Sequence, residues 1–359
     1  MRFLPAMGAR PAGERATRVA ASEHFDGRAF TNSMPGTVIP PGSGRKIVRE
    51  LLLGGQPRKP AGPVPIVKPS GWDEAVAAPE GLQALWLGHA TTLLEIEGRR
   101  VLIDPVWSQR CSPSSLMGPR RLHPMPVALN ELPPLDAIVI SHDHYDHLDM
   151  ATVRELTRTQ SAPFLVPLGV GAHLERWRVP AERIVELDWN GSVELAGLRL
   201  TLTEARHFSG RTFSRNETLW GSWVIAGRRR KVFYTGDTGY FPGFADLGTD
   251  YGPFDLTLVQ IGAYSPYWPD IHMTPEEAIA THLDLRGGLL IPVHWATFNL
   301  ALHSWGDPVD RIWREAKEHD ISLVVPRPGE RVNADDPSEV DGWWQQLAGE
   351  TKRRPPPGG

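Results

Sequence analysis

The 359-residue sequence predicts an α/β protein, in which two mixed β-sheets pack face to face and helices cover their outer faces. Three observations predict this αββα sandwich. Short segments of alternating apolar residues occur throughout the chain, hairpin-like pairs of such segments occur in both halves, and strand-helix units accompany them in both halves.

The first half of the folded body is expected to begin near Ala84. Residues 84–106 alternate in polarity on both sides of a turn at Glu97-Gly98, as two paired strands do. The segments that follow are a strand at 136–141, a helix at 150–158, a strand at 164–167, a helix at 170–177 and a strand at 183–188.

The second half opens with a hairpin pattern. Thr274, Pro275 and Glu277 predict a capped helix that runs to about Asp284, because they form a capping box with proline at the first helical position. The predicted segments are the hairpin at 192–208, strands at 220–227, 231–237, 254–262, 288–295 and 321–326, and a helix from Asp307-Pro308 to 319.

Three regions follow from this pattern. Residues 1–83 are rich in Pro and Gly and predict an extended arm that packs on the core, residues 84–335 form the domain that carries the candidate site, and residues 336–359 are expected to be a C-terminal helix and a disordered tail.

Composition narrows the class of protein. The net charge of −4 gives no broad attraction for nucleic acid, so a nucleic-acid partner is not expected. The single cysteine, Cys111, cannot form an internal disulfide and is expected to be an inert thiol. No secretory leader or membrane span is apparent, so we expect a cytoplasmic protein with at most peripheral membrane contact. A homodimer is compatible with the sequence.

The segment ISHDHYDHLD, residues 140–149, follows the apolar run 137–140 directly. His142 and His144 could not grip one ion from a helix, since side chains two residues apart point in different directions there, but they share a face of an extended segment. The pattern H-x-H-x-D-H, completed by Asp146 and His147, therefore predicts a metal site on a loop at a strand end. Asp143 and Asp149 are expected to face solvent or to cap the following helix.

Further candidate ligands lie at the ends of later strand patterns, at His207, Asp237 and His294. Together with the loop they exceed what one tetrahedral ion needs, so two metals are predicted, with Asp237 as the bridge. Imidazole and carboxylate ligands suit zinc, with iron or manganese as alternatives. The remaining histidines are expected to have surface or core roles; they are His24, His123, His173, His282, His303 and His319.

SHDHYDHLD, TGDTG and PVHW, in that order, resemble the metallo-β-lactamase superfamily over residues 84–325. A finer resemblance is to the N-acyl-phosphatidylethanolamine-hydrolysing phospholipase D family, including its bacterial members. The segments WLGHATTLLEIEGRRVLIDPVWSQRCSP, GPRRL, QIGAYSPYW, HMTPEEA, HWATF and HFDGRAFTN carry it.

The resemblance implies a residue-by-residue assignment. His142, His144 and His207 would hold the first zinc, Asp146, His147 and His294 the second, and Asp237 both. Asp104 and His89 would orient the ligands, and Asp146 and His272 would act in catalysis, His272 from the mouth of the active site.

The implied activity is that of a dinuclear zinc phosphodiesterase of phospholipase D type, with N-acyl-phosphatidylethanolamine or a related lipid phosphodiester as substrate. Two alternatives remain open. The GHA turn and the LIDP element also occur in lactonases of sugar phosphates, and a non-catalytic scaffold could retain the metal site.

Overall fold

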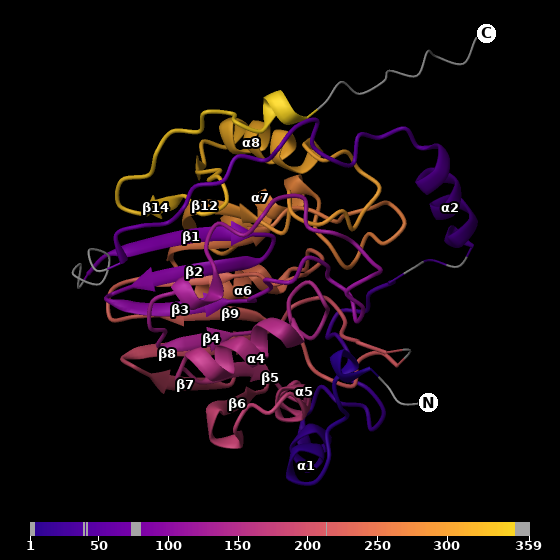
Figure 1. The fold of residues 1–359 in the computed structure, drawn as a ribbon, viewed down its shortest axis with the longest axis vertical. Helices are drawn as coiled ribbons and strands as arrows, with labels where there is room; N and C mark the ends of the chain where they lie inside the picture. Colours follow the sequence, from indigo (N-terminus) through magenta and orange to yellow (C-terminus); the bar gives the residue numbers. More distant parts are fainter. Residues whose placement is uncertain (1–3, 39, 41, 73–79, 213, 349–359) are drawn as a thin grey trace.

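The computed structural model describes residues 4–38, 40, 42–72, 80–212 and 214–348. Over these residues the chain forms two packed β-sheets with helices outside them, as the sequence predicts (Figure 1). Each half of the chain contributes one sheet, apart from a short C-terminal strand that joins the first sheet.

The first sheet has the strand order β14-β1-β2-β3-β4-β5-β6. Its strands are β1 (Leu82–Gly88), β2 (Thr91–Ile96), β3 (Arg99–Ile103), β4 (Ala137–Val139), β5 (Phe164–Pro167), β6 (Ile184–Leu187) and β14 (Arg331–Asn333). β14, β1, β2 and β3 pair antiparallel, and β3 to β6 pair parallel. The turn between β2 and β3 has positive φ at both Glu97 and Gly98, which suits a two-residue hairpin.

The second sheet has the order β13-β12-β11-β10-β9-β8-β7. Its strands are β7 (Ser192–Leu195), β8 (Leu198–Thr203), β9 (Ser222–Ala226), β10 (Lys231–Tyr234), β11 (Phe254–Gln260), β12 (Gly287–Val293) and β13 (Ser322–Leu323). Here β7 to β10 pair antiparallel and β10 to β13 pair parallel. The parallel strands of each sheet end at one edge, where loop residues can gather.

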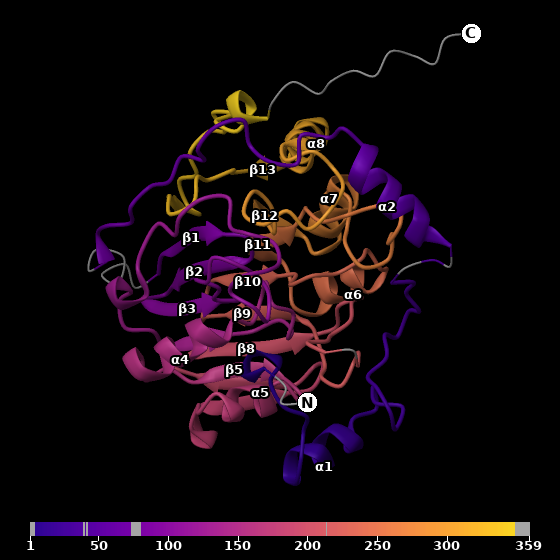
Figure 2. The ribbon, with the colours of Figure 1, turned by 45° about the vertical axis from the view of Figure 1, so that its right-hand side comes forward.

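Helices cover the outer faces of the sandwich (Figures 1 and 2). They are α4 (Met150–Thr159) and α5 (Gly171–Arg176) beside the first sheet, and α6 (Gly243–Asp250), α7 (Pro275–Asp284) and α8 (Asp307–Glu318) beside the second. Asp149 caps α4 by accepting the backbone N–H of Thr152, which confirms the capping role expected for it. The predicted capping box of Thr274 and Glu277 begins α7.

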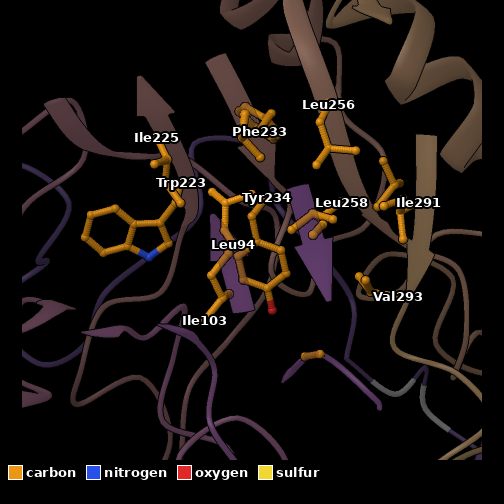
Figure 3. Packing of buried hydrophobic residues seen from close by; sticks show 14 of the residues in the cluster. Leu94, Ile103, Trp223, Ile225, Phe233, Tyr234, Leu256, Leu258, Ile291 and Val293 are labelled. Atoms are coloured by element: carbon orange, nitrogen blue, oxygen red, sulfur yellow. The ribbon is translucent and has the colours of Figure 1, made fainter. Parts of the chain in front are cut away.

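The core lies between the sheets and under the helices. Figure 3 shows Leu94 and Ile103 of the first sheet close to Tyr234 and Leu258 of the second. Along β10 the side chains alternate, so that Tyr234 reaches the first sheet while Phe233 packs against Phe244 of α6. These contacts between the sheets fix the position of one sheet on the other, and with it the relative position of the loops at their edges.

The terminal regions differ in detail from the expectation. The described part of the region predicted as an extended arm contains the α-helices α1 (Glu14–Ala21) and α2 (Ser43–Leu53), and β1 begins at Leu82. Within the described residues after 336, the chain has only a 3-10 turn at Gln345–Leu347 where a helix was predicted; the predicted tail at 349–359 lies outside them. No helix within the described ranges is long and apolar enough to cross a bilayer.

Candidate metal centre

Six strands of the sandwich deliver polar side chains to one edge. The side chains belong to the residues that follow each strand: His89 after β1, Asp104 after β3, residues 141–147 after β4, His207 after β8, Asp237 after β10 and His294 after β12. All seven predicted ligands meet in overlapping clusters whose ligand atoms lie within 4.8 Å of one another. The structure thus brings together residues that lie up to 152 positions apart in the sequence.

Three imidazoles form the first donor set, His142, His144 and His207. The Nε2 atom of His142 lies 2.8 Å from Nδ1 of His144, and that atom lies 3.3 Å from Nε2 of His207. His207 is fixed from behind, because its Nδ1 contacts the carbonyl oxygen of Ile271 at 2.9 Å. Three nitrogens converging in this way match the geometry of a metal ligand set.

The second donor set consists of Asp146, His147 and His294. The Oδ2 atom of Asp146 lies 3.3 Å from Nε2 of His294 and 3.5 Å from Nε2 of His147. His89 adjoins this set, with its Nε2 2.9 Å from the same carboxylate oxygen. The set combines one carboxylate with two imidazoles, so it differs in charge from the first.

Asp237 lies between the two sets. Its Oδ2 is 3.1 Å from Nε2 of both His147 and His294, and 3.9 Å from Nε2 of both His142 and His207. The side chain is 2% exposed, so its charge is shielded from water. One buried carboxylate that faces nitrogens of both sets has the position that a bridging ligand requires.

Unpaired atoms show that the site fits metal ions. Buried side-chain atoms normally have hydrogen-bond partners, yet Oδ1 of Asp237 is buried at the centre of the site without one, and Nε2 of His147 faces Oδ2 of Asp237 at 3.1 Å without hydrogen-bond geometry. Leaving such groups unpaired costs free energy that coordination to a cation would recover. The donors are nitrogens and carboxylate oxygens, the mixture that zinc and similar transition metals bind.

The buried charges set the protonation of the imidazoles. Burial lowers the pKa of His142 and His207 well below the usual value, so both are neutral and ready to ligate. Burial opposes charge on His147 as well, but the carboxylates of Asp237 and Asp146 raise its pKa well above the usual value. In the protein alone, protonated imidazole therefore balances the carboxylates, and a cation would compete with that proton.

Asp104 orients His147 of the second donor set. Its fully buried carboxylate accepts hydrogen bonds from Nδ1 of His147 at 2.6 Å and from the backbone N–H and Oγ of Ser141 at 2.7 and 2.5 Å. The hydroxyl of Tyr234 donates to it at 2.5 Å from the opposite sheet. A carboxylate that holds the far nitrogen of a histidine fixes the direction of the ligating nitrogen.

His89 has a comparable position beside Asp146. Burial and the neighbouring His294 lower the pKa of His89 to about 3, so the ring is neutral, and its Nε2–H donates a hydrogen bond to the carboxylate. Its backbone is held by Thr297, whose Oγ1 accepts the N–H of His89 at 2.6 Å.

His272 lies at the partly exposed side of the centre. Its Nδ1 is 3.9 Å from Oδ2 of Asp237 and has no hydrogen-bond partner. Burial lowers its pKa to about 4, so the imidazole is neutral at physiological pH. The side chain is 13% exposed and so remains accessible from outside, as the 14% exposed side chain of Asp146 also does.

One expectation was wrong. Asp143 was predicted to face solvent or to cap the next helix, but it is buried and pairs with Nε2 of His173 at 3.1 Å. Its other oxygen accepts the backbone N–H of Gly210 at 2.7 Å. Cys111 is buried, and burial raises the pKa of its thiol, in agreement with an inert role.

Sequence reasoning missed three residues that support the site. Tyr234 hydrogen-bonds to Asp104, Arg211 to the carbonyl oxygens of Asp143 and Leu148, and Asn32 to the backbone of His207. A tyrosine on the inward face of a buried strand needs a polar partner, so Tyr234 could have been suspected from the strand pattern. Arg211 and Asn32 lie in irregular segments, and nothing local in the sequence distinguishes them.

Comparisons with known proteins agree with this geometry. A family model described as a beta-lactamase superfamily domain matches residues 99–295, the part that holds every predicted ligand. An uncharacterized protein of Mycobacterium tuberculosis is 50% identical over 345 residues, covering 95% of this chain and 92% of its own length. N-acyl-phosphatidylethanolamine-hydrolyzing phospholipase D 1 of Caenorhabditis elegans is 37% identical over 273 residues, covering 71% and 77%.

Among solved structures, a metallo hydrolase from Ignicoccus hospitalis is similar with a TM-score of 0.55 and 23% identity, covering 70% of this chain and 97% of that one. At that identity the likeness concerns the fold.

Proposed function

Since this chain belongs to the metallo-β-lactamase superfamily and is a metal-dependent hydrolase, we propose that it is a dinuclear zinc phosphodiesterase of phospholipase D type. Its proposed substrate is N-acyl-phosphatidylethanolamine or a related phosphodiester. The observation that carries the proposal is the pair of donor sets on either side of the Asp237 carboxylate.

The first donor set would hold one ion and the second donor set the other, with Asp237 shared. Bound there, two divalent cations would activate a water molecule and neutralise the charge that develops on the reacting group. Asp146 keeps its orientation through His89, and the neutral imidazole of His272 offers a hydrogen bond to a phosphate oxygen at the entrance.

Two observations support a lipid-like phosphodiester. The relative from Caenorhabditis elegans is named for hydrolysis of N-acyl-phosphatidylethanolamine. In addition, aromatic side chains border the donor sets. Phe208 packs on His144 with ring centroids 4.5 Å apart, and Phe298 packs on His89 at 5.1 Å within a small apolar cluster that also contains Tyr145 and Leu300. Acyl chains would find apolar contacts close to the reacting centre.

A substrate panel tests the proposal. The metal-loaded protein would be given N-acyl-phosphatidylethanolamine in detergent micelles, an activated phosphodiester, a lactone and a β-lactam at equal concentration, with metal content measured on the same sample. We expect two metal ions per chain, fastest turnover of a phosphodiester, and release of phosphatidic acid from the lipid. Lactone hydrolysis that outpaces every phosphodiester, without phosphatidic acid by mass spectrometry, would replace this function with the lactonase alternative.

We also propose peripheral contact with lipid surfaces through α2. This helix stands at the periphery of the molecule in Figures 1 and 2 and combines exposed cations with exposed apolar side chains. They are Arg45, Lys46, Val48, Arg49, Leu51 and Leu53. Because Leu53 is 72% exposed and Val48 is 54% exposed, burying them in a bilayer interface would be favourable.

Flotation with vesicles tests this contact. Vesicles that contain anionic lipid should carry the protein, and the Leu51→Glu, Leu53→Glu double variant should lose most of the binding while it keeps activity on a water-soluble phosphodiester. Equal flotation of the variant and the parent would reject α2 as the contact.

A further inference from the structure

A buried arginine joins the leading segment of the chain, residues 4–38, to the loop that carries the donors. Nη1 of Arg211 donates to the carbonyl oxygens of Asp143 and Leu148 at 2.5 and 2.8 Å, and its Nε and Nη2 both donate to the carbonyl oxygen of Ala6 at 3.0 and 2.8 Å. The guanidinium also lies 4.0 Å from the ring centre of Tyr145. Since residues 143 and 148 flank most of the donor loop, Arg211 ties both of its ends to the leading segment.

A histidine makes a second connection at the same place. The backbone N–H of Ala9 donates a hydrogen bond to Nδ1 of His173 at 3.0 Å. The ring proton is therefore on Nε2, which donates a hydrogen bond to Asp143 at 3.1 Å. Gly8 is required for this approach, because a Cβ there would lie 2.0 Å from Nδ1 of His173 and the residue has φ of 76°.

The third connection reaches a donor directly. The side-chain amide of Asn32 pairs with the backbone of His207 in the manner of a neighbouring strand: Nδ2 donates to the carbonyl oxygen at 2.8 Å, and the N–H of His207 donates to Oδ1 at 3.1 Å. Trp220 donates its indole N–H to the same Oδ1 at 3.1 Å, which fixes the amide orientation. His207 is thus held by the leading segment on its backbone and by Ile271 on its ring.

The contacts of His173 and Asn32 lie next to the first donor set, whereas those of Arg211 flank donors of both sets. The donor loop, residues 140–149, lies between the three-residue strand β4 and α4, so few hydrogen bonds between strands hold it in place. No hydrogen bond within the described ranges joins the leading segment to Asp146, His147 or His294, which instead contact Asp104, His89 and Asp237. The leading segment also lies outside residues 99–295, the part that matches the superfamily domain.

We propose that the leading segment positions the first donor set, with His173 and Asn32 as positioning residues, so that the affinity of one metal position depends on a part of the chain that contributes no ligand to it. This inference rests on the proposed dinuclear site. Misplacing a ligand through its supporting contacts lowers metal affinity by roughly 10–100-fold.

Two glycines of the leading segment provide a matched test. Gly8 and Gly13 both have positive φ, 76° and 56°, so alanine strains the backbone at either position. A Cβ at Gly13 meets nothing within 4 Å, whereas one at Gly8 collides with His173. Gly8→Ala should therefore disturb the donor loop, and Gly13→Ala should not.

The measurement is titration of the metal-stripped full-length protein with Co²⁺ and, in competition with a chelator, with Zn²⁺. His207→Ala and His294→Ala each remove a donor from one set and provide reference spectra for the ion bound at the other. We expect Gly8→Ala and Asn32→Ala to weaken the ion of the first set by about 10–100-fold and that of the second set by less than threefold. Arg211→Lys should weaken both ions, because the contacts of Arg211 flank donors of both sets. Lysine keeps the charge of Arg211 but cannot span several carbonyl oxygens.

The outcomes separate the two proposals. If the parent protein does not bind two ions, the proposed function fails. If it does, the inference is overturned when Gly8→Ala and Asn32→Ala fold and keep both affinities, when these two variants weaken both ions equally, or when Gly13→Ala shows the same loss. Thermal unfolding of the metal-stripped proteins controls for a general loss of stability, which would not select one ion.

Discussion

Replacement of Asp104 by asparagine would test how the second donor set is oriented. Oδ2 of Asp104 faces three donors, the Oγ of Ser141, the hydroxyl of Tyr234 and Nδ1 of His147, whereas Oδ1 faces only the backbone N–H of Ser141. An amide keeps the shape but has one acceptor oxygen. The oxygen should turn toward the three donors, which leaves its NH₂ against the N–H of Ser141.

The size of the effect follows from that mismatch. One buried N–H loses its acceptor, which costs about 1–3 kcal/mol, and the bond to His147 loses its charge assistance. A loss of roughly 10–100-fold in metal affinity corresponds to ~1.4–2.7 kcal/mol, in the same range. Tyr234→Phe removes one donor and keeps the carboxylate, so it should cost about 1 kcal/mol, roughly fivefold.

Chelator competition would measure both affinities. The loss in Asp104→Asn should fall mainly on the ion of the second donor set, since His147 belongs to it, and Tyr234→Phe should show a smaller loss in the same position. Parent-like affinity for both ions in a folded Asp104→Asn protein would refute the role of Asp104, and an equal loss in both variants would refute the magnitude argument.

Three further predictions follow from the site. Asp237→Ala should lose metal and turnover together, as measured by elemental analysis and rate, and full turnover with two ions bound would show that this carboxylate is not the bridge. Although burial opposes charge on His294, Asp237 and Asp146 raise its pKa to about 8, so metal uptake must displace a proton below pH 8. Metal affinity should therefore fall as the pH decreases from 8, and calorimetry in buffers of different ionisation enthalpy should detect the release of a proton. Metal binding that does not depend on pH would contradict this prediction. Cys111, buried with a raised pKa, should resist alkylation by iodoacetamide at pH 8 until the protein is unfolded, and rapid labelling of the native protein would contradict its burial.

The sequence predicted those parts of the fold that local physics determines. The Glu97-Gly98 hairpin and the capping box that begins α7 depend on residues within a few positions of each other, and both were confirmed. The residue types and spacing in the donor loop were also informative, because a carboxylate and three imidazoles in one short segment have few other uses.

Long-range contacts explain what was missed. Asp143 resembled a solvated loop residue, but its burial depends on His173, which lies 30 positions away on α5. Asn32 contacts His207 across 175 positions and Tyr234 contacts Asp104 across 130. The helices α1 and α2 were missed because the many prolines and glycines of their surroundings obscured two short helical segments.

Backbone strain at the site gives a physical reason why local patterns stop being informative there. Five non-glycine residues close to the donors have left-handed φ values between 39° and 64°: His89, Asp104, Ala263, His294 and Ala296. Such conformations cost of order 1–3 kcal/mol each and persist only where the surroundings enforce them. One hydrogen bond links the two strained residues His89 and His294, since the N–H of His294 donates to the carbonyl oxygen of His89 at 2.8 Å. This bond joins the end of β1 in the first sheet to the end of β12 in the second. The sharp turns that follow let side chains from opposite sheets face one another, so the strain accompanies the assembly of a single centre from two sheet edges.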